Sequence, residues 1–393
     1  MMVHFRKRFP SDFINRVNEM MMGEDIYERL VRKIQAEKDT NGDDDEPRPP
    51  APTGGGERKQ DTGDNKGKLM LDATVAPADI RYPNDLSLLN ESRENLELII
   101  EELWQSGDRK GHKTGYGRKK ARKEYLSITK QKKPRIAKIR KVVGRQLVYV
   151  RKDIETIGRL LARSGVDALS EKRIKRIMTI CEVHRQQERM YKERGHACEN
   201  RIVSLKQPHI RPMVRGKAGK PYEFGQKVSA AVVDGYVFID RQSYDGFHEG
   251  VKLIESVEQY RERFGFYPEA VLADTIYRNR TNLSYCKEHS IRLSGPRLGR
   301  PKAKPTSEEK SQAYRDSSER NMIEGRFGIG KRRYGLGLVM AYLPETGLTE
   351  VALKVLCMNV ALKMKKLLSL FLSYTKYLFV VVSADDFLLF SVE

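Results

Sequence analysis

Two aspartates in this sequence each follow a short apolar run of the kind that forms a buried strand. Asp72 comes after the run 69–71, and Asp274 comes after the run 271–273. In α/β sheets, ligand sites lie beyond the carboxyl ends of the strands, so two such aspartates on neighbouring strands would converge. Their carboxylates would repel one another unless a cation lay between them, and oxygen ligands of this kind suit Mg²⁺ or Mn²⁺. The alternative for either aspartate alone is a turn or helix-capping residue.

A third acid, Glu324, lies in a stretch whose spacing indicates a helix. Arg320, Glu324, Phe327 and Lys331 fall on one helical face, which presents one acid among several bases. A bound metal needs the acid and a DNA phosphate needs bases, so the candidate phosphate contacts here are Arg320, Arg326, Lys331, Arg332 and Arg333. Glycines at 325, 328 and 330 weaken the helix, so Lys331 is expected past its end. The alternative is a solvated helix with many salt bridges.

A second basic region extends from Arg109 to Arg145. It holds sixteen Lys or Arg residues and one acid, Glu124. Sustained charge of one sign is typical of a disordered segment or of a surface that binds a polyanion, and it could contact DNA backbone without reading sequence. The candidate contacts in this region are Arg118, Lys119, Lys120, Arg122 and Lys123. The alternative is a solvated loop.

The whole chain is strongly basic. It has 393 residues, with 74 Lys and Arg against 53 Asp and Glu, a net charge of +21. Such an excess indicates a polyanionic partner, either nucleic acid or an anionic membrane surface. No clean apolar stretch is long enough for a transmembrane helix, and the four separated cysteines are typical of free thiols in a reducing cytosol. The sequence contains no Walker loop, HExxH or GxSxG motif, which argues against a nucleotide-driven motor, a zincin and an α/β-hydrolase.

The elements that must position these acids form an α/β pattern. A strand at 68–75 is followed by a long stretch, 85–204, with helical rather than strand periodicity. Two apolar runs flank Asp234-Gly235, which predicts a type I′ hairpin. The remaining predictions are helices at 249–264, 278–289, 307–336 and 348–374 and strands at 270–274 and 291–294. This order predicts a central sheet flanked by helices, with Asp72 and Asp274 on neighbouring strands and 85–204 as a helical insertion.

Composition divides the chain into parts. Residues 1–37 have helical apolar spacing and are interpreted as a small N-terminal module. Residues 38–67 are rich in Asp, Pro and Gly and cannot bury enough apolar surface to order themselves, which predicts a disordered linker. Residues 68–375 form the predicted catalytic domain, and 376–393 form a tail of uncertain structure.

Several segments carry a resemblance to a known family. The most specific are 69–77, 83–86, 204–212, 215–217, 223–228 and 320–328, together with the strand ending at Asp274. In these segments the chain resembles the DDE transposases of bacterial insertion sequences, in particular the insertion-sequence-five group. The resemblance implies a ribonuclease H-like fold and a catalytic triad of Asp72, Asp274 and Glu324. It also implies that residues 5–9 end a longer helical N-terminal region in other members.

The resemblance extends to a signature around the glutamate, Tyr-x2-Arg-x3-Glu-x6-Lys. Arg320, Glu324 and Lys331 match it, whereas Ser317 stands at the tyrosine position and Tyr314 lies one helical turn earlier. The absence of tyrosine at position 317 concerns the contact with phosphate and not the binding of metal.

The activity that the resemblance implies is DNA transposition. The three acids would bind two Mg²⁺ or Mn²⁺ ions for in-line phosphoryl transfer. The partner would be double-stranded DNA, as terminal inverted repeats and as target, bound by a homodimer in the nucleoid of the bacterial cytoplasm. Two alternatives remain: a decayed or domesticated DNA-binding protein without catalysis, and a metal-dependent nuclease without strand transfer.

Overall fold

The chain folds into two compact units. The computed structural model describes residues 9–23, 26, 65–106, 117–214, 222–299 and 306–375, and the backbone of 376–389. The α/β unit combines Met1–Pro77 with Lys227–Glu393, and the helical unit is Ala78–Gln226. Most of the predicted linker at 38–67 lies outside the described residues, as do the segment 215–217 and the side chains of 376–393.

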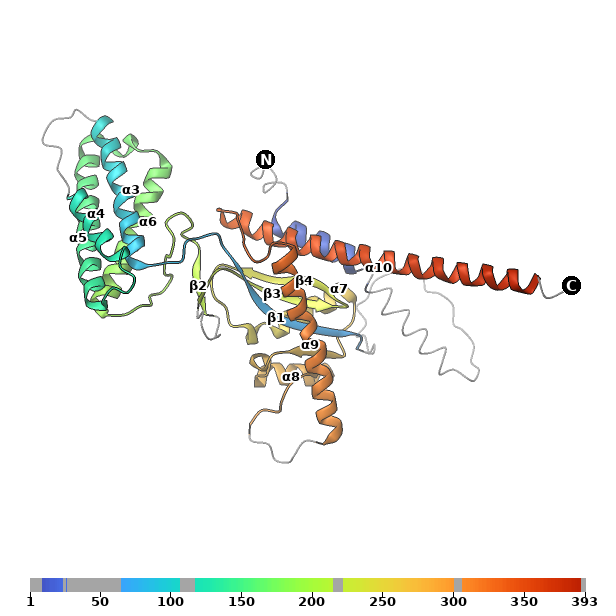
Figure 1. The fold of residues 1–393 in the computed structure, drawn as a ribbon. Helices are drawn as coiled ribbons and strands as arrows, with labels where there is room; N and C mark the ends of the chain where they lie inside the picture. The colour runs from blue at the N-terminus through green and yellow to red at the C-terminus, as the bar shows by residue number, and fades with distance from the viewer. Residues whose placement is uncertain are drawn as a thin grey trace, which may run out of the picture. The chain divides into compact units, whose positions relative to one another are not determined.

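Among the described residues, six strands form one mixed sheet (Figure 1). Its order is β2-β3-β1-β5-β6, with β4 also paired to β3. The pairs β1–β5 and β5–β6 are parallel, and β2–β3 and β3–β4 are antiparallel. The bounds are β1 Lys68–Pro77, β2 Arg211–Val214, β3 Tyr222–Val233, β4 Tyr236–Ser243, β5 Ala270–Ala273 and β6 Arg292–Leu293. The predicted mixed α/β class is confirmed.

The hairpin between β3 and β4 has the predicted turn. Asp234 and Gly235 have φ values of 49° and 81°, as the two central residues of a type I′ turn require. Asp and Gly adopt positive φ with little conformational strain, so the turn could be predicted from the sequence. Further along, Ser229 pairs with Arg241 and Ala230 with Ile239, which leaves Asp240 as the extra residue of a β-bulge.

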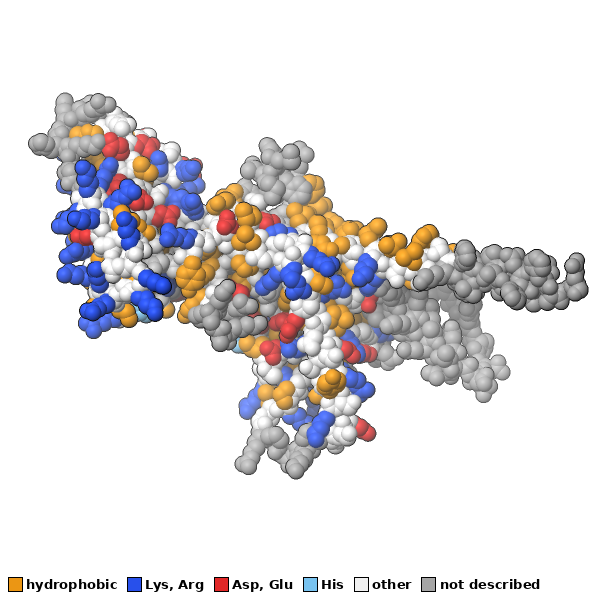
Figure 2. Space-filling model, viewed as in Figure 1, with side chains coloured by type: hydrophobic (Ala, Val, Ile, Leu, Met, Phe, Trp, Pro, Cys, Tyr) orange, Lys and Arg blue, Asp and Glu red, His pale blue; other side chains and the backbone are white. Residues whose placement is uncertain are grey.

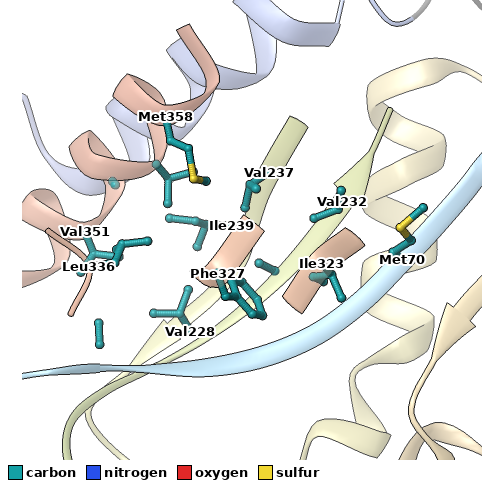
Figure 3. Packing of buried hydrophobic residues seen from close by; sticks show 14 of the residues in the cluster. Met70, Val228, Val232, Val237, Ile239, Ile323, Phe327, Leu336, Val351 and Met358 are labelled. Carbon is teal, nitrogen blue, oxygen red and sulfur yellow. The ribbon is translucent and has the colours of Figure 1, made fainter. Parts of the chain in front are cut away.

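Helices cover both faces of this sheet. On one face, side chains of α9 (Ser307–Arg333) and α10 (Pro344–Leu389) pack on alternate residues of the strands, as Figure 3 shows for Ile323, Phe327 and Met358. On the other face, α7 (Leu253–Phe264) and α8 (Arg280–Glu288) contribute side chains to a second buried cluster. Each fully buried large apolar side chain contributes about 1.5–3 kcal/mol, so the two clusters hold the sheet in a three-layer arrangement.

The helical residues 11–23 also pack on the α/β unit. Ile14 is buried in the cluster with α9 and α10, and Met22 is buried in the cluster with α7. Asn18 donates a hydrogen bond to the Val237 carbonyl at 3.0 Å and accepts one from Asn359 of α10 at 2.9 Å. These buried polar contacts join the N-terminal segment to the strand and to the last helix.

Helix α9 ends three residues before the end expected at 336, and its glycines do not break it. It ends at Arg333, so Lys331 lies within the helix and not past its end. The reason is packing: Ile323 and Phe327 are anchored in the core, and Gly330 leaves the space that Leu336 occupies, since a Cβ there would lie 2.5 Å from Leu336 Cδ1. The buried contacts outweigh the helix-weakening effect of glycine, which is about 1 kcal/mol per residue.

The helical unit is a bundle of α3 (Asp85–Ser106), α4 (Arg118–Thr129), α5 (Ile136–Ser164) and α6 (Glu171–Glu193). Its core is built from Leu, Ile and Val side chains of α3, α5 and α6. Asn84 begins α3 by accepting hydrogen bonds from the backbone N–H groups of Leu86 and Ser87. In the described parts of the chain, no helix has the length and apolarity needed to cross a membrane.

A charged network is buried inside this bundle. The Arg93 side chain is 2% exposed and pairs with Glu97 one turn later. Asp153 of α5 is buried beside it, and burial, followed by the charge of Glu97, raises the Asp153 pKa to about 7, while Arg93 and Arg118 oppose the rise. The folded pKa lies above the ordinary 3.8, so the stability contributed by the proton on Asp153 is lost as pH rises from about 4 to about 7.

We therefore expect Asp153→Asn to stabilise the helical unit at pH 8, by on the order of 2 kcal/mol, and to have no effect near pH 4. The measurement is the hydrogen-exchange protection of α3 and α5 at both pH values. Asp167→Asn, at an exposed position, is the control and should change neither. Weaker protection of the Asp153→Asn variant at pH 8 would contradict this account of the network.

Candidate active site

Asp72 and Asp274 lie on neighbouring parallel strands, as expected. Leu71 pairs with Ala273, the last residue of β5, so Asp72 is the next residue of β1 and Asp274 is the first residue after β5. Met70 and Leu272, two residues earlier, both belong to the cluster under α9 and α10. Side chains alternate between faces along extended backbone, so Asp72 and Asp274 leave the sheet on the α9 side.

Both aspartates also make local hydrogen bonds. Asp274 Oδ1 accepts from the backbone N–H of Thr275 at 2.6 Å, which caps the short helix η3 (Thr275–Tyr277). Asp72 Oδ1 accepts from the N–H of Ala73 at 2.8 Å. The capping role considered for single aspartates is therefore present at Asp274, and it holds this carboxylate at the end of β5.

Helix α9 brings Glu324 to the same region. The helix packs against β1 and β5, with Ile323 and Phe327 buried beneath it. Glu319 accepts from Lys68 of β1 at 2.8 Å, which fixes the helix along the strand. The Glu324 side chain itself is 58% exposed and pairs with Arg320 at 3.5 Å, so it lies at the open side of the site.

The pKa of Asp72 depends on its burial and on the charged residues around it. Its pKa is raised to about 6, first by burial and then by Glu249 and Glu324, against the opposing effects of the Ala73 N–H and Arg320. Arg320 and Glu324 are thus within electrostatic range of Asp72. Glu249, in the short helix η2 (Glu249–Val251), was not singled out from the sequence, because nothing in its local pattern marks it.

These residues fit a divalent cation in their chemistry. All the donors are carboxylate oxygens, which Mg²⁺ and Mn²⁺ prefer, and the raised pKa of Asp72, caused first by burial and then by its acidic neighbours, shows a local excess of negative charge that a cation would relieve. Among the described residues, no three acidic, His or Cys side chains are already close enough to enclose a metal ion. Asp72 is half-buried, whereas Asp274 and Glu324 are both exposed.

The other basic residues of α9 differ in their surroundings. Arg326 is half-buried against the β3–β4 turn, where a Cβ on Gly235 would lie 2.8 Å from its Nη2, and burial lowers the pKa of its guanidinium. Arg332 and Arg333 are exposed in the last turn, and Lys331 is half-buried. Arg326 therefore supports the hairpin, and the last turn carries the accessible charge.

The basic residues of α4 also differ in their surroundings. Arg118 donates to the Glu97 carbonyl at 2.9 Å and lies 3.5 Å from Glu101, so it joins α4 to α3. The other four, Lys119, Lys120, Arg122 and Lys123, are exposed, and none of them forms a salt bridge with a described residue. Lys and Arg side chains gather over α4 and α5 in Figure 2.

Comparison with known proteins gives one family. The model of the family described as "Transposase DDE domain" matches residues 271–361, which run from β5 into α10 and include Asp274 and Glu324. The match supports a DDE transposase as the class of protein, and that class implies DNA as substrate and the use of divalent metals. Neither the curated proteins nor the solved structures include a significant match to this chain.

The pKa of Asp72 leads to a prediction for metal binding without DNA. A carboxylate must be deprotonated to bind a cation, so below pH 6 the apparent Mn²⁺ affinity should fall by up to about tenfold per pH unit. Calorimetric titration of the protein between pH 5 and pH 8 measures it. Asp72→Asn should bind weakly at every pH. An affinity that is constant between pH 5 and pH 7 would exclude Asp72 as a ligand.

The α4 surface leads to a prediction for DNA binding. Changing Lys119, Lys120, Arg122 and Lys123 together to Gln should weaken binding to any duplex and lower the log–log salt slope by roughly 0.9 per lost phosphate contact. Fluorescence anisotropy at several salt concentrations gives the slope. Arg118→Gln is the matched comparison, since it should destabilise the α3–α4 contact and leave the slope nearly unchanged. An unaltered slope in the fourfold variant would remove α4 from the DNA interface.

Proposed function

We propose that this chain is a DDE transposase that cuts and joins DNA with Asp72, Asp274 and Glu324 as its metal-binding triad. The observation that carries the proposal is the pairing of β1 with β5, which sets two aspartates side by side under the helix that bears Glu324. The family match over the segment that contains two of the three acids supports it. In this proposal the acids bind two Mg²⁺ or Mn²⁺ ions.

In the proposed site, the acids bind metal ions and the arginines contact phosphate. Asp72 would present its carboxylate from β1, Asp274 from the residue that follows β5, and Glu324 from α9. Bound at these acids, Mg²⁺ or Mn²⁺ would supply activation of the attacking oxygen and stabilisation of the leaving oxygen in an in-line phosphoryl transfer. Arg320, beside Glu324, neutralises the acid before loading and is placed to contact a substrate phosphate. Arg332 and Arg333 supply further charge along the same helix.

The finer assignment rests on sequence resemblance. We infer a ribonuclease H-like fold, which the strand order supports, since a hairpin flanks β1 on one side and two parallel strands flank it on the other. We further infer a bacterial insertion-sequence element of the insertion-sequence-five group, acting in the cytoplasm. The chain would act as a homodimer on terminal inverted repeats and target DNA.

A second candidate is a decayed transposase that binds DNA without cutting it. The open position of Glu324 and the serine at 317 favour it. Under this alternative the exposed cations of α4 still bind duplex DNA, so DNA binding alone does not distinguish the two functions. Cleavage does.

The deciding experiment uses DNA from the ends of the coding element, located first by finding short inverted repeats in the flanking sequence. The protein should nick this duplex with Mg²⁺ or Mn²⁺, and Ala at Asp72, Asp274 or Glu324 should lower nicking by at least about 1000-fold while sparing DNA affinity, because these acids bind the catalytic metals. Asp79→Ala is the control and should keep most activity.

Strand-transfer products with a labelled end separate a transposase from a nuclease. If the unaltered chain binds the ends but does not nick them, the decayed alternative holds. If nicking survives in all three Ala variants, the triad is wrong.

A further inference from the structure

The first half of α9 is attached to the sheet by charged residues and not by apolar packing. In this fully described helix the buried residues are Asp316, Ile323, Phe327 and Gly330. Before Ile323, therefore, the one buried side chain of the helix is an aspartate. Core contacts hold the second half of α9, and ion pairs attach the half that precedes Glu324.

Two contacts make this attachment, and they are named here the α9–strand ion pairs. Asp316, whose side chain is 7% exposed, pairs with Arg292 of β6 and accepts a further hydrogen bond from Gln312 at 2.8 Å. Both carboxylate oxygens of Glu319 accept from Lys68 of β1, at 2.9 and 2.8 Å. Each pair joins α9 to a different strand, so a shift of the helix along its axis would break at least one of them.

The two cations lie in one row of the sheet. Ala270 of β5 pairs with Lys68 on one side and with Arg292 on the other. Ala270 is buried in the cluster under α9 and α10, so the row faces α9. Residues paired across parallel strands point to the same face, which explains how both cations reach acids of one helix.

The candidate site lies at a similar distance from this row along the helix and along the strand. Glu324 follows Asp316 by eight residues, or about 12 Å of helix, and Asp72 follows Lys68 by four residues, or about 13 Å of strand. A change of one turn in the register of α9 would displace Glu324 by about 5 Å. The contacts that fix the helix to the row therefore also fix how far Glu324 extends toward Asp72.

A buried ion pair is better evidence for register than for stability. The free-energy cost of removing two charges from water largely offsets their attraction, so such a pair contributes little to folding. Its best-documented use is to select one register between packed elements. Asp316 suits this use, because a buried aspartate accepts few arrangements of its cation, whereas an apolar side chain would tolerate several.

We propose that the α9–strand ion pairs position Glu324 for metal binding by fixing the register of α9 against β1 and β6. Their four residues are positioning residues, since they act through Glu324. Residues that orient a metal ligand commonly change metal affinity by about 10- to 100-fold when removed. This inference rests on the proposed function, because it assigns Glu324 a metal.

The test is Lys68→Gln, with Mn²⁺ affinity measured by calorimetry in the absence of DNA. Removing a cation near the acids would raise Mn²⁺ affinity if charge alone mattered. We expect instead a fall of at least about tenfold, because the register of α9 is lost. Lys310→Gln is the matched control: it removes the same charge from an exposed position near the start of α9 and should leave the affinity unchanged.

Two further comparisons identify the contact and the ligand through which it acts. Lys68→Glu combined with Glu319→Lys exchanges the charges, and this double variant should recover most of the affinity that either reversal alone removes. In a Glu324→Gln background, Lys68→Gln should have no further effect. Arg292→Gln should also weaken Mn²⁺ binding, and its unfolding temperature should fall, since Asp316 is left buried without its cation.

The outcomes separate this inference from the proposed function. If Glu324→Gln weakens Mn²⁺ binding and Lys68→Gln leaves it unchanged or stronger, the positioning role is wrong and the triad stands. If Glu324→Gln itself leaves Mn²⁺ binding unchanged, Glu324 is not a ligand, and the triad and this inference are both wrong. If Lys68→Gln weakens binding equally with and without Glu324, the ion pair acts on another ligand and the inference is wrong.

Discussion

The parallel pairing of β1 with β5 is the contact on which the α/β unit depends. It joins segments that are separated in sequence by the entire helical unit. The entropy cost of closing a loop rises only slowly with its length, so a folded insertion of this size is compatible with a stable sheet. The pairing buries Leu69 and Val271 on one face and Met70 and Leu272 on the other, and these contacts stabilise both packed layers.

The same pairing creates an electrostatic problem at the strand ends. It sets Asp72 beside Asp274, and the folded core desolvates Asp72 while Glu249 and Glu324 lie within range. Lys227 and Arg320 each pair with one of the surrounding glutamates, and neither pairs with an aspartate of the strands. In the proposed function, a divalent cation would offset the repulsion among these acids.

In the helical unit, by contrast, the buried acids are accompanied by arginines. Its interior holds the arginine–carboxylate network of Arg93, Glu97 and Asp153, and Arg118 closes that network from α4. The neighbouring cations of α4 have no such role and stay at the surface. One helix therefore carries both a cation that supports the fold, at its first residue, and cations that stay at the surface.

The sequence by itself determined the local elements and the strand-end aspartates. Apolar runs marked β1 and β5, and Asp234-Gly235 marked the hairpin, because these signals depend on side-chain alternation and on backbone φ within a few residues. The ion pairs and the burial depended on the tertiary structure. Arg326 and Arg118 carry the same charge as their neighbours, yet both are taken up by internal contacts.

No local sequence pattern distinguishes Glu249, because its ion-pair partner, Lys227, lies in β3. The continuation of α9 past Gly330 likewise depended on Leu336, which fills the space that the glycine leaves. Local periodicity is encoded in neighbouring residues, whereas desolvation and pairing arise only when distant segments meet, and for that reason the elements were predictable and the surroundings of the site were not.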